Sequence, residues 1–175
     1  GELCARARAL ELLTHARVPF VVGGAYAFGT YTHIHRDTKD LDLFLRPSHA
    51  HAGLLVLGAD GWRTERTDEQ WIYKAFKGPW FVDLIFNSGN GTAQVDDEWF
   101  TYARRAVVMG HQVLLAPPEE LILSKAFVLE RERYDGSDVA HLFQSTAHSL
   151  DCERLVGRFD RYWEVLMAHL MLFRF

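Results

Sequence analysis

The stretch of the sequence that most constrains the fold is Asp40 to Leu43, in which carboxylates alternate with leucines. Successive side chains of a strand point to opposite faces, so we expect Asp40 and Asp42 to emerge together while Leu41 and Leu43 enter a core. Two carboxylates one pleat apart repel each other, and aspartate has a low preference for strands. A positive charge is therefore expected between them, and a divalent metal ion is the simplest candidate.

A short apolar run and two glycines precede this strand. Phe20–Val22 follows Pro19 and predicts a buried strand that ends at Gly23 and Gly24. Glycine lets the backbone turn tightly and approach a ligand closely, and Ala25–Thr32 is compatible with a helix starting there. The N–H groups at a helix N-terminus bind phosphate readily, so this turn predicts a phosphate cradle. Taken alone, a Gly-Gly pair is equally compatible with an ordinary turn.

A third acid, Asp83, stands within the apolar run FVDLIF. Strands are expected at 62–65, 71–76 and 80–86, with a tight turn at 77–79 between the last two. A lone carboxylate in such a run is costly unless it is neutralised, hydrogen-bonded or bound to metal. By itself Asp83 is also compatible with capping backbone N–H groups at a sheet edge. Together with Asp40 and Asp42 it predicts a two-metal site for phosphoryl transfer.

The rest of the chain predicts further short strands and, at the C-terminus, further helices. We expect a catalytic domain at 1–115 and a helical segment packed on it at 116–175. In that segment a helix opens at Pro117–Glu120 and continues to Gly136, with Ile122, Ala126 and Leu129 as its buried stripe. A final packing helix is expected from apolar residues at three- and four-residue steps: Leu155, Phe159, Tyr162, Leu166, Leu170 and Phe173.

Composition excludes some classes of protein. The net charge of the 175 residues is −4, so no global basic field favours nucleic acid, although a local patch stays open. Cys4 and Cys152 lie far apart and are expected to be reduced thiols. His33 and His35 have the spacing of a ligand pair, but no third zinc ligand is identifiable. No apolar run approaches the roughly 20 residues of a membrane span, and no signal peptide is visible, so a cytoplasmic protein is expected.

The ordered set of motifs resembles a known family. Gly23-Gly24, a spacer at 25–39, the Asp40-x-Asp42 pair and the later strand acid Asp83 look like the nucleotidyltransferase superfamily that includes DNA polymerase β. The long spacer is similar to that of the Gly-Gly branch, which contains lincosamide, aminoglycoside and toxin-type nucleotidyltransferases. This resemblance covers roughly residues 18–86, and the segment 117–142 is similar to the helices that follow the catalytic sheet in small members.

The resemblance implies a polymerase β-like α+β fold, in which a mixed β-sheet is flanked by helices and followed by C-terminal helices. It also implies an NTP substrate and two Mg²⁺ ions. Gly23 and Gly24 would approach the triphosphate, while Asp40, Asp42 and Asp83 would hold the metals. Asp83, or a water molecule that it orients, is also the candidate base for the acceptor hydroxyl. The remaining phosphate contacts are predicted to be Arg36, Thr38 and Lys125. The chain departs from the commonest family pattern at Gly24, where a serine usually supplies a hydroxyl.

The sequence is compatible with two functions. The first is an enzyme that moves an NMP from an NTP to a hydroxyl acceptor, which is a small molecule, a protein side chain or an RNA 3′ end. The acidic net charge slightly disfavours RNA. The second is a non-catalytic nucleotide-binding or toxin–antitoxin type module that retains the fold, with a homodimer or partner surface on the C-terminal helix. Structural acids on an unrelated α+β fold are the third interpretation.

Overall fold

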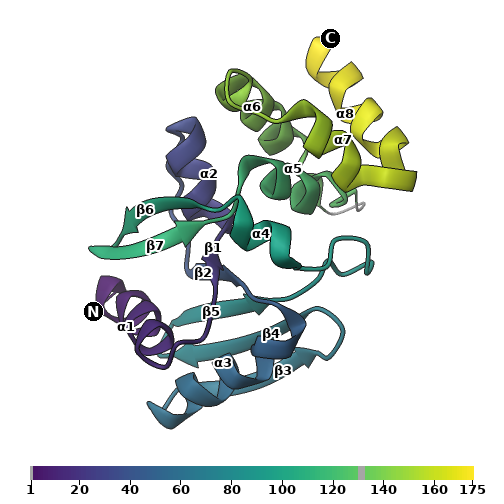
Figure 1. The fold of residues 1–175 in the computed structure, drawn as a ribbon. Helices are drawn as coiled ribbons and strands as arrows, with labels where there is room; N and C mark the ends of the chain where they lie inside the picture. Colours follow the sequence, from purple (N-terminus) through teal and green to yellow (C-terminus); the bar gives the residue numbers. More distant parts are fainter. Residues whose placement is uncertain (1, 130–132) are drawn as a thin grey trace.

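The computed structural model describes residues 2–129 and 133–175, and its centre is a mixed seven-stranded sheet (Figure 1). The strands are Val21–Val22 (β1), Asp40–Phe44 (β2), Arg63–Asp68 (β3), Ile72–Lys77 (β4), Trp80–Ile85 (β5), Arg104–Val108 (β6) and His111–Leu115 (β7). The α-helices are Glu2–His15 (α1), Gly24–Thr32 (α2), Pro47–Ala59 (α3), Asp97–Thr101 (α4), Pro118–Ala126 (α5), Gly136–Thr146 (α6), Cys152–Phe159 (α7) and Trp163–Arg174 (α8). The predicted α+β class with a mixed sheet is confirmed. Among the described residues, no helix combines the length and apolar character that crossing a membrane requires.

The sheet has the order β3-β4-β5-β2-β1-β7-β6, which places the two acid-bearing strands β2 and β5 side by side near its middle. They run parallel, whereas β1 pairs antiparallel with β2 and parallel with β7. The leucines that alternate with the acids are fully buried, including Leu41, Leu43 and Leu84. The helices α1 and α3 pack together and against β5, and Gly53 of α3 lets Leu45 and Leu84 approach closely. The core behind β2 and β5 therefore fixes the direction in which their acids point.

The C-terminal helices gather at one end of the sheet, but two predicted helices are interrupted (Figure 1). The helix expected to continue to Gly136 ends at Ala126, so the prediction of Leu129 as a buried position is wrong: Leu129 is exposed and bridges to Tyr134. Residues 130–132 of that expected helix lie outside the described residues. The chain returns because the Asp135 N–H donates to the Val128 carbonyl at 3.3 Å, and Gly136 then begins α6.

The final segment is also divided, since a 3-10 turn at Asp160–Tyr162 separates α7 from α8. Asp160 has a φ of 44° there. The break lets two aromatic side chains surround Phe127, whose ring centre lies 5.7 Å from that of Phe159 and 5.6 Å from that of Tyr162. Leu155, Phe159 and Leu166 are buried as predicted, but Leu170 is exposed because α8 does not continue the stripe of α7.

A buried ionic cluster fastens α7 to α5. Arg154 donates to Glu120 at 2.6 Å and also bonds Glu119, and both carboxylates are buried. Arg158 extends the cluster to Asp96, the N-cap residue of α4, at 2.7 Å. Burial raises the pKa of the Glu120 carboxyl, and the Arg154 guanidinium opposes that rise. The two arginines therefore place positive charge beside the buried carboxyl groups and couple α7 to α5 and α4.

Arg154→Ala should lower the free energy of unfolding by about 3 kcal/mol at neutral pH, because it removes the arginine that bonds both buried carboxylates. The loss should shrink on acidification, since Glu120, with its raised pKa, is among the first carboxyls to take up a proton. Urea denaturation at neutral and acidic pH measures both effects. Arg161→Ala is the control, because Arg161 is exposed and donates to the neighbouring Tyr162 hydroxyl. Equal stability of Arg154→Ala and the wild type at neutral pH would contradict the role of the cluster.

Candidate active site

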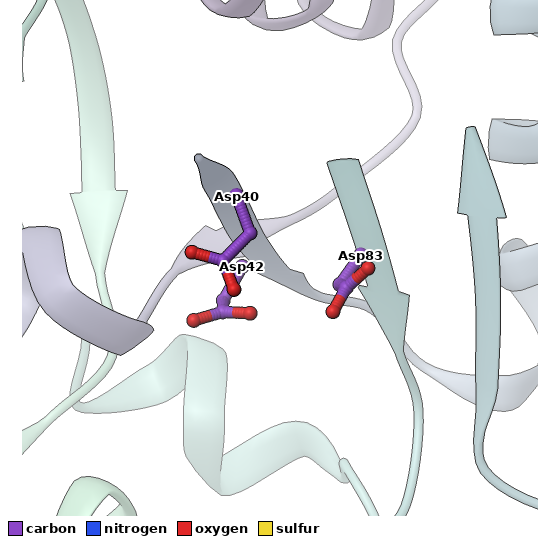
Figure 2. A group of neighbouring side chains, drawn as sticks. All are labelled: Asp40, Asp42 and Asp83. Carbon is purple, nitrogen blue, oxygen red and sulfur yellow. The ribbon is translucent and has the colours of Figure 1, made fainter. Parts of the chain in front are cut away.

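Three aspartates from two neighbouring strands converge on one space. Asp40 and Asp42 come from β2 and Asp83 from β5, and the parallel register pairs Asp42 directly with Asp83. Each aspartate offers one carboxylate oxygen, and these three oxygens all lie within 4.8 Å of one another. Figure 2 shows the three side chains turned to the same side. Among the described residues, this is the one group of three acidic, histidine or cysteine side chains close enough to share a metal ion. The structure therefore brings together the acids that the sequence analysis selected.

The glycine turn lies directly against these acids. Gly24 begins α2 with a φ of +51°, and a Cβ placed there would lie 1.7 Å from Oδ2 of Asp42. A Cβ on Gly23 would lie 2.2 Å from the ring of Phe44. The Gly23 N–H donates to the Asp42 carbonyl at 3.0 Å, which holds the turn to β2. Any side chain at Gly24 would push α2 away from the acids, so both glycines are needed for this approach.

The electrostatics of the site favour a cation. Burial raises the pKa of Asp42 to about 7, and the neighbouring charges of Asp40 and Asp83 add to the rise. Burial also raises the pKa of Asp83, which its ion pair with Lys74 counteracts. Carboxylate oxygens are the ligands that Mg²⁺ prefers, so the donor set fits a hard divalent cation. Such an ion would offset both the burial and the repulsion that disfavour the ionised form of Asp42.

Lys74 is a site residue that the sequence analysis missed. It lies opposite Asp83 on β4, and its Nζ donates to both carboxylate oxygens of Asp83, at 2.7 and 2.9 Å. The predicted three-residue turn at 77–79 would pair Phe76 with Trp80 and place Tyr73 opposite Asp83. In the structure Lys77 pairs with Trp80, so the turn is one residue shorter and Lys74 lies beside Asp83. Asp42, Asp83 and Lys74 thus form a row across three adjacent strands.

The three predicted phosphate contacts, Arg36, Thr38 and Lys125, do not line the same pocket. The Thr38 hydroxyl donates to the Asp40 carboxylate, and Lys125 lies on the wall of the acidic pocket. Lys125 is held there by Asp138, to which its Nζ donates at 2.7 Å. Arg36 forms a two-pronged ion pair with the same Asp138, at 2.7 and 3.2 Å, and lines a separate cavity of about 310 Å³. A phosphate role for these residues stays a prediction, and of the three Lys125 is the one that lines the acidic pocket.

A pocket of about 510 Å³ opens above the three acids. On one side it is lined by Gly24 and by Ser124 and Lys125 of α5. On the other side are side chains from the β3–β4 hairpin, including its turn, and from the loop after β5: Thr67, Trp71, Lys74, Asn87, Ser88 and Asn90. Its volume falls in the range of pockets that bind small molecules. The acids therefore form the floor between a glycine-and-lysine wall and an aromatic, amide-rich wall.

Comparison with known proteins agrees with this geometry. The model of a family described as "Nucleotidyl transferase of unknown function (DUF2204)" matches residues 3–170. Comparison with the sequences of curated proteins gave no match.

Several solved structures share the fold. A crystal structure of ANT(2'')-Ia in complex with adenylyl-2''-tobramycin superposes with a TM-score of 0.65 at 16% identity, covering 91% of this chain and 98% of that one. The solution structure of this antibiotic-resistance factor gives 0.63 at 14% identity, with 97% and 96% covered. The lincomycin-bound lincosamide antibiotic adenylyltransferase LnuA gives 0.53 at 16% identity, with 76% and 90% covered. At these identities the likeness shows a common fold.

Asp42→Asn should stabilise the metal-free protein at alkaline pH. The folded-state pKa of Asp42, about 7, lies above its unfolded value of ~3.9. The contribution of Asp42 to the free energy of unfolding is therefore complete below the unfolded pKa and is lost as pH rises through about 7. Asparagine cannot ionise, so at pH ~8 the variant should exceed the wild type by about 1–2 kcal/mol after allowance for solvent screening, or a few degrees in Tm. The gain should disappear near pH ~4.

Thermal unfolding in EDTA across this pH range measures the difference. Asp37→Asn is the matched control, because Asp37 is an exposed aspartate in the loop just before β2. A constant difference between Asp42→Asn and wild type at all pH values would show that Asp42 does not experience the repulsion described above.

Proposed function

Since this chain belongs to the nucleotidyl transferase family, we propose that it moves a nucleoside monophosphate from an NTP to a hydroxyl group with the help of Mg²⁺. The observation that carries the proposal is the convergence of Asp40, Asp42 and Asp83 directly against the glycine turn at the start of α2. This convergence places carboxylates that can hold cations beside backbone N–H groups that can donate to phosphate oxygens, as transfer from a triphosphate requires.

The three aspartates would hold two Mg²⁺ ions. When bound, these ions neutralise the triphosphate and stabilise the attacking and leaving oxygens. The protein's own part is to keep the carboxylates crowded and aimed at one point. The leucines behind β2 and β5 prevent the strands from turning, and the Thr38 hydroxyl, by donating to Asp40, fixes the orientation of that carboxylate.

The triphosphate is proposed to lie on the side of Gly24 and Lys125. The N-terminus of α2 is open there because its first residue carries no side chain, so its N–H groups can reach phosphate oxygens. Lys125 supplies a positive charge from the facing wall. Its ammonium group is held by Asp138, and this contact positions the charge before the nucleotide arrives.

The acceptor is proposed to approach from the opposite side, over Asp83. In-line displacement places the attacking and leaving oxygens on opposite sides of the reacting phosphorus. With the triphosphate beside Gly24, the attacking hydroxyl would lie near Asp83, whose carboxylate Lys74 favours in the ionised form needed to accept a proton. Asp83 is therefore the proposed base, and Lys74 the residue that orients it.

The wall beyond Asp83 suggests a small hydroxylated acceptor. It offers the indole of Trp71 and the amide and hydroxyl groups of Asn87, Ser88 and Asn90, which suit a molecule with apolar faces and hydroxyls. The loop is ordered by its own contacts, since the Ser88 hydroxyl accepts from the backbone N–H groups of Thr92 and Ala93, at 3.0 and 2.9 Å. The structural neighbours bound to lincomycin and to an adenylylated tobramycin support this choice over an RNA end or a protein side chain.

The proposal is tested by thermal unfolding with each NTP, with and without Mg²⁺, on the wild type and on Asp42→Ala. Binding to the native state raises the apparent stability, by about 2.7 kcal/mol when the ligand stands at a hundred times its Kd. One NTP should raise Tm in a Mg²⁺-dependent way in the wild type and in the control Asp37→Ala, and the rise should be absent in Asp42→Ala. An equal rise in Asp42→Ala, or no rise with any NTP, would contradict the proposed site.

Pyrophosphate release separates an enzyme from the non-catalytic alternative. Incubation of the wild type with the stabilising NTP, Mg²⁺ and hydroxylated acceptors should release pyrophosphate, whereas Asp83→Asn should bind the NTP and release at least about a hundredfold less. NTP binding by the wild type without pyrophosphate release would favour the nucleotide-binding module instead.

A further inference from the structure

The helix α8 carries an apolar stripe that no described residue covers. Trp163, Met167, Leu170 and Met171 are 51%, 47%, 39% and 58% exposed. Met167, Leu170 and Met171 follow Trp163 by four, seven and eight residues, so all four side chains lie on one face of the helix. This spacing is also the one by which an amphipathic helix binds another helix or a groove.

The opposite side of α8 is already committed to the fold. Leu166 and His169 are buried, and the His169 ring bonds the Ala126 carbonyl at 2.9 Å. Phe173 is 43% exposed, and its ring contacts that of Phe143 in α6, with ring centres 5.7 Å apart. The helix contacts α5, α6 and α7 and forms the outer edge of the helical end of the molecule (Figure 1). A second helix can therefore lie along the exposed stripe without disturbing the packing beneath.

We propose that the exposed stripe of α8 pairs with the same stripe of a second copy of this chain, in a two-fold antiparallel arrangement centred on Met167. This pairing is self-complementary, as a two-fold interface requires. Trp163 then faces the partner subunit's Met171, and sulfur–aromatic contacts of this kind are favourable. The antiparallel order also sets the two helix dipoles in opposite directions.

Charges at the two ends of α8 favour the same arrangement. Glu164 lies in its first turn and Arg174 in its last turn, and both are exposed. Within the part of the chain that the structure describes, neither side chain forms an ion pair. Antiparallel pairing brings Arg174 toward the end of the partner helix that carries Glu164, whereas parallel pairing would align like charges. The charges thus select the antiparallel second copy.

The exposed area is sufficient for a weak to moderate dimer. About half of each of four large side chains is exposed, which corresponds to roughly 400 Å² of apolar surface per subunit. A standard interface covers about 800 Å² per partner, of which somewhat more than half is apolar, or about 450 Å². The stripe matches that apolar share, and the flanking charged residues would form the polar rim.

The test is the solution mass of the full chain, by light scattering or sedimentation at micromolar concentrations. The wild type should show twice the monomer mass of 20.1 kDa. Met171→Glu places a charge within the stripe, opposite the partner subunit's Trp163, and should raise the dimer dissociation constant at least about tenfold. Leu172→Glu is the matched control, because Leu172 is the adjacent residue, is 62% exposed and lies outside the stripe, so this variant should remain a dimer.

Three outcomes would overturn the proposal: a wild type that stays monomeric throughout, a dimer unaffected by Met171→Glu, or equal weakening by Met171→Glu and Leu172→Glu. Circular dichroism of both variants checks that α8 is still folded. Arg174→Glu provides a second measurement, because it replaces the ion pairs at both ends by repulsion. It should weaken the dimer, and the weakening should diminish at high salt.

Discussion

The mutual repulsion of three partly buried carboxylates is the constraint on which the site depends. Asp40, Asp42 and Asp83 share a space of a few ångströms, and the pKa of Asp42 rises to about 7 as a result of burial and of its two neighbours. An arrangement that opposes ionisation persists only where the surrounding structure holds it. Lys74 offsets part of the charge by bonding Asp83, and a bound cation would offset the rest.

The fold supplies that support from two directions. Behind the acids, buried leucines on β2 and β5 anchor the strands against α1 and α3, so the carboxylates cannot turn away. In front, Gly24 lets α2 begin in contact with Asp42, and Lys125 of α5 faces the same pocket. The Arg154 cluster fastens α7 to α5 and so steadies the helical wall. The pocket is thus assembled from segments distant in sequence.

Patterns with a strict geometric consequence were predictable from the sequence. The alternation of aspartate and leucine at 40–43 predicts which side chains of β2 face the core, and the apolar run around Asp83 predicts β5. The two strands lie next to each other in one sheet. Lys74 was missed because the predicted turn at 77–79 is one residue longer than the observed one, and the register of β4 against β5 depends on that length. Helix ends were predicted less well: Leu129 and Leu170 have the spacing of buried residues but are exposed, because tertiary contacts around Phe127 and Tyr134 end α5 and break the last helix. Arg36 was assigned to phosphate by its place in the loop, and its ion pair with Asp138 depends on a helix a hundred residues away.

The central claim, that the three aspartates form a cation site, is tested most directly by titrating the nucleotide-free protein with Mn²⁺ and measuring the free ion by electron paramagnetic resonance. The account predicts saturable binding by the wild type above pH ~7, weaker binding as pH falls and Asp42 takes up a proton, and little binding by Asp42→Asn. Equal Mn²⁺ binding by Asp42→Asn and the wild type, or no binding by the wild type at any pH, would contradict it.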